Sequence, residues 1–243
     1  MLPFVVLKEE SEERPSMDRY AVIHTKMPRE FVLLQGQGCK WGKCTFCDYH
    51  QDVSEDPYAT NKDVLERITG ELGVLDVINS GSALELDDRT ISHIRHIVQE
   101  KKIHTVWFEA HWMYRHQLKS FAEQFTPATV KFRCGVETFD PKLRIFWKKG
   151  IPSHVTAQDV AQFFHGVCLL CCTNGEEKER ILSDIQTAKQ YFEYFSVNIF
   201  CNNSTAIRLD QDLVSWVKEE VYPFIKDEQG IEVLFNNTDL GVG

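Results

Sequence analysis

The sequence predicts an α/β protein built as a partial (β/α)6 barrel, and three observations support this fold class. Short runs rich in β-branched and aromatic residues alternate with longer segments of helical periodicity roughly six times along the chain. The connections between them are short, which is typical of right-handed βα units around a parallel sheet. The 243 residues, 43% of them hydrophobic, suffice for one sizeable core. Roughly six units are too few to close an eight-fold barrel, so we expect a partial one.

Short apolar runs are the predicted strands, and segments with apolar residues at i, i+3, i+4 and i+7 are the predicted helices. The strands cover residues 31–35, 74–79, 105–109, 130–136, 165–171, 196–201 and 231–235. The helices cover residues 62–72, 88–101, 115–124, 141–149, 176–192 and 210–226. We expect a single domain over residues 1–243, made of an N-terminal extension (1–30), the barrel (31–235) and a C-terminal tail near the active site (236–243).

The charge balance favours a small-molecule partner. The formal net charge is −9 and the pI about 5.5, so no overall positive field attracts the chain to nucleic acid, and direct tRNA binding is not expected. Lys142, Arg144, Lys148 and Lys149 form one local basic cluster, which we interpret as a solvated helix face. The first residues, MLPFVVLKEESEERP, have no cationic start and no small-residue cleavage site, and no stretch reaches the ~20 apolar residues of a membrane span. We therefore expect a cytoplasmic protein with no signal peptide and no membrane partner.

Polar residues gather where the predicted strands end. In parallel barrels the chemistry lies at the carboxyl ends of the strands, and here the strand-end sequences INSGS, FEAHW, CGVET, FCNNS and FNNTD are small and polar. Residues two apart share a strand face, so we expect the polar phase to line the interior of the barrel. The residues in this phase include Glu109, His111, Arg133, Glu137, Asn198 and Asn202. They predict a binding cavity; the alternative is a set of buried polar pairs, such as Arg133 with Glu109.

Cys39, Cys44 and Cys47 lie in one loop, within LLQGQGCKWGKCTFCDYH, directly after the first predicted strand. Their spacing is C-x4-C-x2-C, and three interpretations fit it. With His50 they make a Cys3His zinc site. Cys44 and Cys47 alone make a redox pair, which leaves Cys39 unexplained. Alternatively, the three thiolates hold a [4Fe-4S] cluster and leave one iron open to another ligand. The other five cysteines fall in apolar runs, where we expect buried free thiols.

The order of these motifs resembles the radical S-adenosylmethionine (radical SAM) superfamily over residues 31–235. Members of that superfamily carry C-x3-C-x-Φ-C, and Phe46 stands here at the aromatic position Φ. The segments NSGS, GVETFDPKLRIFWKKG and HGVCLLCCTNGEEKERILSDI resemble its glycine-rich segment, its G-[IV]-E-[ST] stretch, and its fifth strand with the start of the next helix. This sequence differs by one residue inserted between the first two cysteines. The resemblance implies a TIM-type radical SAM barrel.

The resemblance also implies two cofactors, a [4Fe-4S] cluster and SAM. Cys39, Cys44 and Cys47 would ligate the cluster. The residues implied to bind SAM are Phe46, Ser80, Gly81, Ser82, Glu137, Thr138, Cys171 and Phe200. One electron, from a flavodoxin- or ferredoxin-type donor, would cleave SAM to a 5′-deoxyadenosyl radical that abstracts a hydrogen atom from the substrate. We also consider a homodimer as the oligomeric state of the protein.

Within the superfamily, this short chain resembles the queuine lyases of bacterial queuosine salvage, which release 7-aminomethyl-7-deazaguanine (preQ1) from queuine. A 7-deazapurine suits the expected cavity, because carboxylates accept the N–H pair of a guanine-like edge. We assign Glu109, His111 and Arg133 to catalysis. The residues assigned to substrate binding are Glu109, His111, Asn202, Asn236 and Asp239. Two alternatives stay open: a radical SAM enzyme acting on another heterocycle or on a protein, and a zinc-binding, non-catalytic module.

Overall fold

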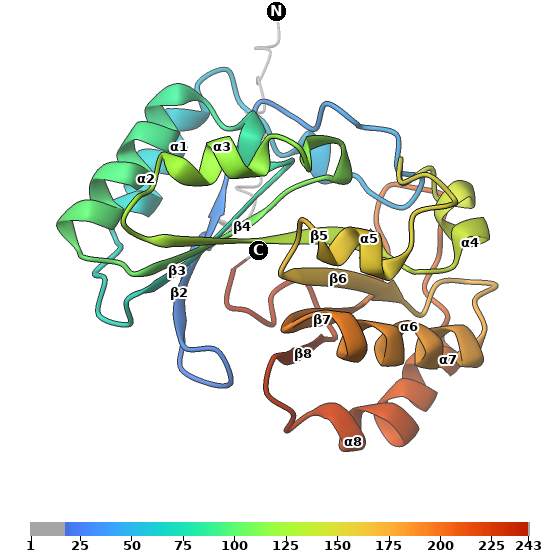
Figure 1. Ribbon diagram of the computed structural model, residues 1–243. Coiled ribbons are helices and arrows are strands. Elements are labelled where there is room, and N and C mark those ends of the chain that lie inside the picture. The colour runs from blue at the N-terminus through green and yellow to red at the C-terminus, as the bar shows by residue number, and fades with distance from the viewer. Residues whose placement is uncertain (1–17, 243) are drawn as a thin grey trace, which may run out of the picture.

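The fold comes from a computed structural model that describes residues 18–242. Eight strands form one curled sheet in chain order (Figure 1). They are β1 (Tyr20–Ile23), β2 (Arg29–Leu34), β3 (Val74–Asn79), β4 (Thr105–Glu109), β5 (Thr129–Glu137), β6 (Gly166–Cys171), β7 (Tyr194–Ile199) and β8 (Ile231–Leu234). β1 is antiparallel to β2, and every later strand is parallel to the one before it. This partial parallel barrel confirms the predicted fold class. Most of the expected N-terminal extension, residues 1–17, lies outside the described residues.

Helices cover the outer face of the sheet (Figure 1). They are α1 (Pro57–Leu65), α2 (Asp88–Glu100), α3 (Leu118–Glu123), α4 (Pro141–Phe146), α5 (Ala157–Ala161), α6 (Lys178–Tyr191), α7 (Gln211–Trp216) and α8 (Tyr222–Ile225), with 3-10 turns η1 (Tyr49–Gln51), η2 (Ala83–Glu85) and η3 (Trp112–Tyr114) and a π segment η4 (Val217–Val221). Side chains cap several of them: Asp87, Asp140 and Asp210 accept hydrogen bonds from the first backbone N–H groups of α2, α4 and α7. These caps fix where the chain leaves the rim of the barrel and turns back along its outer face.

Most elements lie where the periodicity predicts them, and the differences have local causes. β3 and β4 have the predicted bounds. β1 and α5 were not predicted, because four and five residues are too few to establish a period. The helix expected over residues 210–226 is divided into α7, η4 and α8. The π segment lies directly before the turn that holds Pro223, which has no N–H to continue an α-helix.

The two faces of the sheet differ in chemistry. Val32, Leu75, Val106 and Val167 are fully buried on the outer face, where the helices pack against them. Residues of the other phase point into the barrel, and many of them are polar. The hydrophobic core therefore lies outside the barrel, and the interior is left for a site. Across residues 18–242, none of the helices combines the length and the hydropathy that a membrane span requires.

Candidate active site

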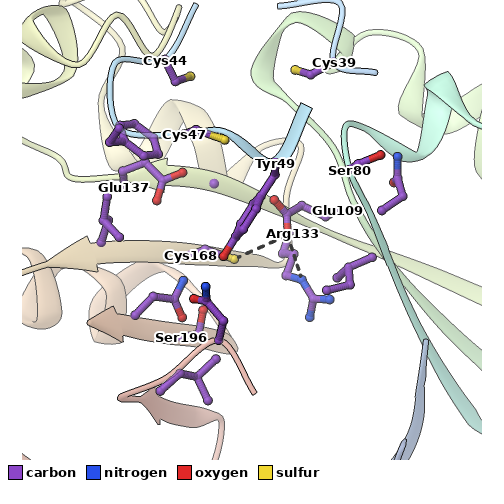
Figure 2. A pocket seen from close by; sticks show the side chains of 18 of the residues that line it. Cys39, Cys44, Cys47, Tyr49, Ser80, Glu109, Arg133, Glu137, Cys168 and Ser196 are labelled. Carbon is purple, nitrogen blue, oxygen red and sulfur yellow. Dashed lines mark hydrogen bonds and ion pairs between the residues drawn. The ribbon is translucent and has the colours of Figure 1, made fainter. Parts of the chain in front are cut away.

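A cavity of about 290 Å³ opens at the carboxyl ends of the strands, a volume close to that of small-molecule sites. The cysteine loop after β2 lies across it, and the inner faces of β3 to β8 form its floor and walls (Figure 2). The predicted site residues that line it are Cys39, Cys44, Phe46, Cys47, Ser80, Gly81, Ser82, Glu109, His111, Arg133, Glu137, Asn198, Phe200 and Asn236. The structure thus brings together residues from six parts of the chain that the sequence analysis selected separately.

The cysteine loop is held in place by contacts with the segments that follow β5 and β7. Phe46 packs in a small apolar cluster with Trp147, Phe200 and Ile207. The Thr45 N–H donates to the Trp147 carbonyl over 3.0 Å, and the Asn203 side-chain amide donates to the Phe46 carbonyl over 2.7 Å. The aromatic residue of the motif is therefore an anchor for the loop. The backbone carbonyl of Phe46, a residue implied to bind SAM, already has a partner in Asn203.

The donor chemistry of this loop fits an iron–sulfur cluster. Cys39, Cys44 and Cys47 are free thiols that all line the same cavity (Figure 2). His50 lies on η1, is exposed and does not line the cavity, so it does not supply the fourth ligand of a Cys3His zinc site. Within residues 18–242, no three metal-ligating side chains stand close enough together to hold a metal ion. Burial raises the pKa of Cys47 to about 12, which means that metal binding must displace its proton.

The glycine-rich segment after β3 packs against the start of the cysteine loop. A Cβ on Gly81 would lie 2.3 Å from Glu85 Oε2 and 3.1 Å from the Gly38 carbonyl oxygen, so only glycine allows this close approach. Glu85 accepts hydrogen bonds from the Lys40 N–H (3.2 Å), the Ser82 N–H (3.0 Å) and the Tyr114 hydroxyl (2.7 Å). This buried carboxylate, which the sequence analysis missed, joins the start of the cysteine loop to the β3 rim.

The predicted serines also hold the backbone in place. Ser80 Oγ accepts from the Gly36 N–H and Ser82 Oγ accepts from the His111 N–H, both over 3.0 Å. Each hydroxyl keeps its own proton to donate. Both residues line the cavity, and their expected contact with SAM stays a prediction.

A buried charge network forms the floor of the cavity. Arg133 binds Asp76 through both terminal nitrogens, one of them at 3.0 Å, and Arg29 Nε donates to the same carboxylate over 2.8 Å. Arg29 also makes two hydrogen bonds to Glu232, at 2.9 and 2.8 Å, and Glu232 accepts from the Tyr194 hydroxyl at 2.7 Å. The network fixes Arg133 and neutralises it. The assignment of Arg133 to catalysis stays a prediction. The ion pair between Arg133 and Glu109, at 3.7 Å, is longer than the 3.0 Å hydrogen bond between Arg133 and Asp76.

Glu109 faces the cavity beside this floor (Figure 2). Its Oε2 lies 3.7 Å from Arg133 Nε and 3.9 Å from the Cys168 sulfur, while 35% of its side chain stays accessible from the cavity. Burial raises the pKa of Glu109, although the charge of Arg133 opposes this shift. Of the assigned catalytic residues, Glu109 is the one whose polar atoms remain available to a bound molecule.

Glu137 reaches the cavity because of a backbone irregularity. The β5–β6 register shifts between Gly135 and Glu137, and Glu137 has a positive φ of 65°. Its carboxylate accepts from Lys149 Nζ over 2.7 Å. A Cβ on Gly135 would lie 2.7 Å from that carboxylate and 3.0 Å from the ammonium, so glycine leaves room for the pair.

Lys149 corrects our interpretation of the basic cluster. Lys142 and Lys148 are exposed, as expected of a solvated face, whereas Arg144 and Lys149 are buried. α4 ends at Phe146, and positive φ values of 53° at Lys148 and 78° at Gly150 turn the following segment toward the cavity. Burial lowers the pKa of Lys149, but the neighbouring Glu137 carboxylate outweighs this and leaves it raised.

Both ring nitrogens of His111 have hydrogen-bond partners within the protein. Its Nε2 donates to the Lys149 carbonyl at 2.7 Å, and its Nδ1 accepts from the Met113 N–H at 3.2 Å, so both ring nitrogens are occupied. Burial lowers its pKa to about 4, which keeps the ring neutral. The ring stacks on Trp41, with centroids 5.4 Å apart and planes at 16°. The ring therefore supports Trp41, and the assignment of His111 to catalysis and substrate binding stays a prediction.

Four predicted residues do not line the cavity. Thr138 and Cys171 belong to the outer phase of their strands: Thr138 donates to Asp184 on α6 at 2.6 Å, and Cys171 is buried in the main core. Asn202 accepts from the Leu209 N–H at 2.9 Å in the loop after β7. Asp239 accepts from the Phe235 and Asn236 N–H groups and so closes the turn after β8. The alternation of inner and outer residues along the strands would have excluded Thr138 and Cys171 from the cavity.

Tyr49 is a cavity residue that the sequence analysis missed. It follows the last cysteine by two residues, lies on η1, and its ring projects into the cavity between the cysteine loop and the strand floor (Figure 2). The Ser204 N–H and hydroxyl donate to the preceding Asp48 at 3.0 and 2.9 Å, which fixes the start of η1. The signal available in the sequence was its place directly after the CxxC pair.

Comparisons with known proteins agree with this site. A scan of family models and a search of curated protein sequences gave no match. Among solved structures, the chain is 40% identical to a "queuine lyase from Clostridium spiroforme bound to SAM and queuine", with a TM-score of 0.89 and coverage of 94% of this chain and 100% of that one. It also resembles Streptococcus suis SuiB bound to S-adenosylmethionine, at 17% identity and a TM-score of 0.52, over 86% of this chain and 47% of the other. The second likeness concerns the fold alone.

A partial parallel barrel with a three-cysteine loop across the carboxyl ends of its strands is the arrangement of a radical SAM enzyme, with its [4Fe-4S] cluster and SAM as cofactors. The 40% identity over the whole of the Clostridium spiroforme chain allows a narrower assignment. This chain belongs to the queuine lyase family.

Proposed function

We propose that the protein is a radical SAM lyase that cleaves queuine and releases preQ1. The observation that carries this proposal is the 40% identity, over all of that chain, to a queuine lyase bound to SAM and queuine. When bound, the cluster and SAM supply a 5′-deoxyadenosyl radical, which abstracts a hydrogen atom from the substrate. Loss of that hydrogen from the cyclopentene ring weakens the bond to the exocyclic nitrogen. The residues of the chain bind, orient and enclose the reactants.

Cys39, Cys44 and Cys47 would hold the cluster, and Cys44 and Cys47 pack against the apolar residues around Phe46. Because both the loop and its anchor face the cavity, SAM bound at the open iron would lie between the loop and the strand rims. Ser80 and Ser82 at the β3 rim have hydroxyl protons to donate, and Glu137 at the β5 rim has a carboxylate to accept. We propose that these three groups bind SAM.

Glu109 is the residue best placed to recognise the base. It enters the cavity from the end of β4, and the fixed Arg133 beside it restricts its orientation. A carboxylate in this position accepts the paired N–H groups of a 7-deazaguanine edge, and the low-dielectric surroundings strengthen those hydrogen bonds. The faces of Tyr49 and Phe200 line the same space and provide apolar contact for a flat ring.

The segment after β8 closes the cavity. Asn236, Asn237, Leu240 and Val242 line it, and Val242 is 3% exposed. This placement supports the expected role of residues 236–243 as a tail near the active site. We propose that the tail excludes water from the reacting groups, which protects a radical from side reactions.

Three further expectations accompany this function. We propose a flavodoxin- or ferredoxin-type protein as the electron donor, because the cluster must receive one electron in each cleavage of SAM. We propose a cytoplasmic location, where thiols stay reduced. Free queuine, and not tRNA, is the proposed substrate, in agreement with the net charge of −9.

Anaerobic incubation with SAM, dithionite and a panel of 7-deazapurines, followed by mass analysis, tests the function. We expect queuine to disappear while preQ1 and 5′-deoxyadenosine form together, and the other 7-deazapurines to be left unchanged. Cleavage of SAM that does not depend on queuine would favour another heterocycle or a protein substrate. Colourless protein with stoichiometric zinc and no absorption near ~400 nm would exclude the cluster altogether.

A further inference from the structure

Two segments far apart in the sequence form one continuous surface beside the cysteine loop. The Trp41 indole N–H donates to the Lys148 carbonyl over 2.8 Å, and the Thr45 N–H donates to the Trp147 carbonyl over 3.0 Å. Trp41 also packs on Gly150, where an added Cβ would lie 2.5 Å from the indole ring. Figure 1 shows the loop after β2 running across to α4. We call the outward side of residues 40–45 and 141–148 the α4 surface.

The α4 surface is positively charged in a chain whose net charge is −9. Lys43, Lys142 and Lys148 are exposed on it, and the sequences CKWGKCTFC and PKLRIFWKKG contain no aspartate or glutamate. Lys43 Nζ lies 5.0 Å from the Trp41 ring centroid, which places its charge over the part of the loop that contacts Lys148. The nearest acids along the chain lie just outside these two segments: Asp48 accepts from Ser204, and Asp140 caps α4. The segments of the α4 surface therefore carry an excess of positive charge in an otherwise acidic chain.

The same surface exposes two large apolar side chains. Ile145 is 61% and Phe146 is 63% exposed, although both belong to a helix that packs on the barrel. They stand three and four residues after Lys142, so the three side chains share one helix face. Exposed apolar groups surrounded by like charges are typical of a surface that binds another protein.

We propose that the α4 surface is the docking site of a reduced flavodoxin, an acidic protein that carries a flavin. This rests on the proposed function, which requires a one-electron donor. The flavin hydroquinone gives up one electron and becomes the semiquinone, while the cluster changes from the 2+ to the 1+ state, so one electron leaves and one arrives. The surface is built in part from the loop that carries the three cysteines, so a donor docked there reaches the cluster over a short path.

Charge complementarity selects the partner. Lysines steer an acidic protein to this face of an otherwise acidic enzyme, and Ile145 and Phe146 provide apolar contact for the exposed edge of the flavin. Encounters between electron-transfer proteins bury little area and depend strongly on such steering. Binding at the α4 surface should therefore weaken as salt is added.

The test compares a Lys142→Glu/Lys148→Glu variant and a Phe146→Ser variant with the wild-type holoenzyme. Neither lysine side chain nor Phe146 lines the cavity. A Lys119→Glu/Lys226→Glu variant is the charge-matched control, because both lysines are exposed, one on α3 and one after α8, away from α4 (Figure 1). The first readout is the affinity for labelled oxidised flavodoxin, measured by fluorescence anisotropy at low and high salt. The second is 5′-deoxyadenosine formation with queuine, driven either by reduced flavodoxin or by dithionite.

We expect the Lys142/Lys148 reversal to weaken flavodoxin binding about ten-fold or more at low salt and to remove most of its salt dependence. Phe146→Ser should weaken binding with the salt dependence intact. Turnover driven by flavodoxin should fall in both variants, while turnover driven by dithionite and all properties of the control variant stay unchanged. Unaltered flavodoxin binding in the Lys142/Lys148 reversal would overturn the proposal. Failure of dithionite-driven queuine cleavage in the wild-type enzyme would instead overturn the proposed function.

Discussion

Glu109 is the side chain on which substrate recognition depends in this account, and its carboxylate makes a testable prediction. In Glu109→Gln the amide cannot accept both N–H groups of the base, so Kd for queuine should rise about 10- to 100-fold, which corresponds to roughly 1.4–2.7 kcal/mol. SAM binding should be unchanged, because Arg133 stays paired with Asp76. Isothermal titration of each ligand separates the two effects, and equal loss for both ligands would contradict a role in substrate recognition.

The same carboxyl group should make binding depend on pH. Burial raises the pKa of Glu109, so it takes up a proton at a higher pH than an ordinary glutamate does. Because the carboxylate is the form that accepts hydrogen bonds, affinity for queuine should fall as the pH falls through this raised pKa. In Glu109→Gln that dependence should disappear. A wild-type affinity that stays constant through the acid range would contradict the assignment.

Asp76 illustrates what the strand sequence did not reveal. In VLDVIN it is an isolated acid within an apolar run, and the structure shows it between Arg29 and Arg133 with no exposed surface. In Asp76→Asn both guanidinium groups lose a buried counter-charge, so the free energy of unfolding should fall by about 3–5 kcal/mol. Asp56→Asn, which removes an exposed pair with Arg89, should cost at most about 1 kcal/mol in the same urea titration. Equal losses would contradict the proposed importance of the network.

At the scale of elements, the cysteine loop should be separable from the barrel. Cys44→Ala should lose its iron and its absorption near ~400 nm while unfolding within about 1 kcal/mol of wild type, because Cys44 is only half-buried and packs at the edge of a small cluster. Cys201→Ala, a cavity cysteine outside the loop, should keep its iron. Iron content and thermal unfolding, measured on the same preparations, check both statements. A Cys44→Ala protein that retains iron would contradict the ligand set.

The turn between β6 and α6 should make stability depend on pH. Burial raises the pKa of Glu176 from 4.5 to about 7, so the folded protein favours the protonated form. The stabilisation of the folded state by the protonated Glu176 is fully present below pH 4.5 and is lost as the pH rises toward 7. The free energy of unfolding should change by up to about 3 kcal/mol over this range. Glu176→Gln should flatten the decline in unfolding free energy over this range, whereas replacing the exposed Glu179 with Gln should not. If the unfolding free energy of Glu176→Gln declined as steeply as that of the wild type, other groups would be the cause of the decline.

Strand and helix positions were predictable because their periodicity extends over enough residues to be recognised. The alternating polar phase also placed Glu109, Arg133, Glu137 and Asn198 correctly on the inner face. Contacts between distant segments were not predictable. The burial of Lys149 follows from the positive φ at Lys148, and the hydrogen bond of His111 Nε2 depends on a carbonyl 38 residues later. Asn202 and Asp239 are held within their own loops by hydrogen bonds to backbone N–H groups.

At the scale of the whole molecule, the fold separates two tasks. The outer face of the sheet carries the apolar core that stabilises the protein, and the inner face is left polar for a ligand. The cysteine loop crosses the open end of the barrel, and the C-terminal segment lines the cavity from the β8 side. Cluster, SAM and substrate would therefore meet within one enclosure, which is the condition for passing a hydrogen atom from substrate to cofactor without loss to water.

Transfer of deuterium tests the central claim most directly. Queuine deuterated on its cyclopentene ring is incubated anaerobically with the holoenzyme, SAM and reductant, and 5′-deoxyadenosine and preQ1 are analysed by mass spectrometry. The account predicts one deuterium in 5′-deoxyadenosine and its formation together with preQ1. Unlabelled 5′-deoxyadenosine, formed without preQ1, would contradict it.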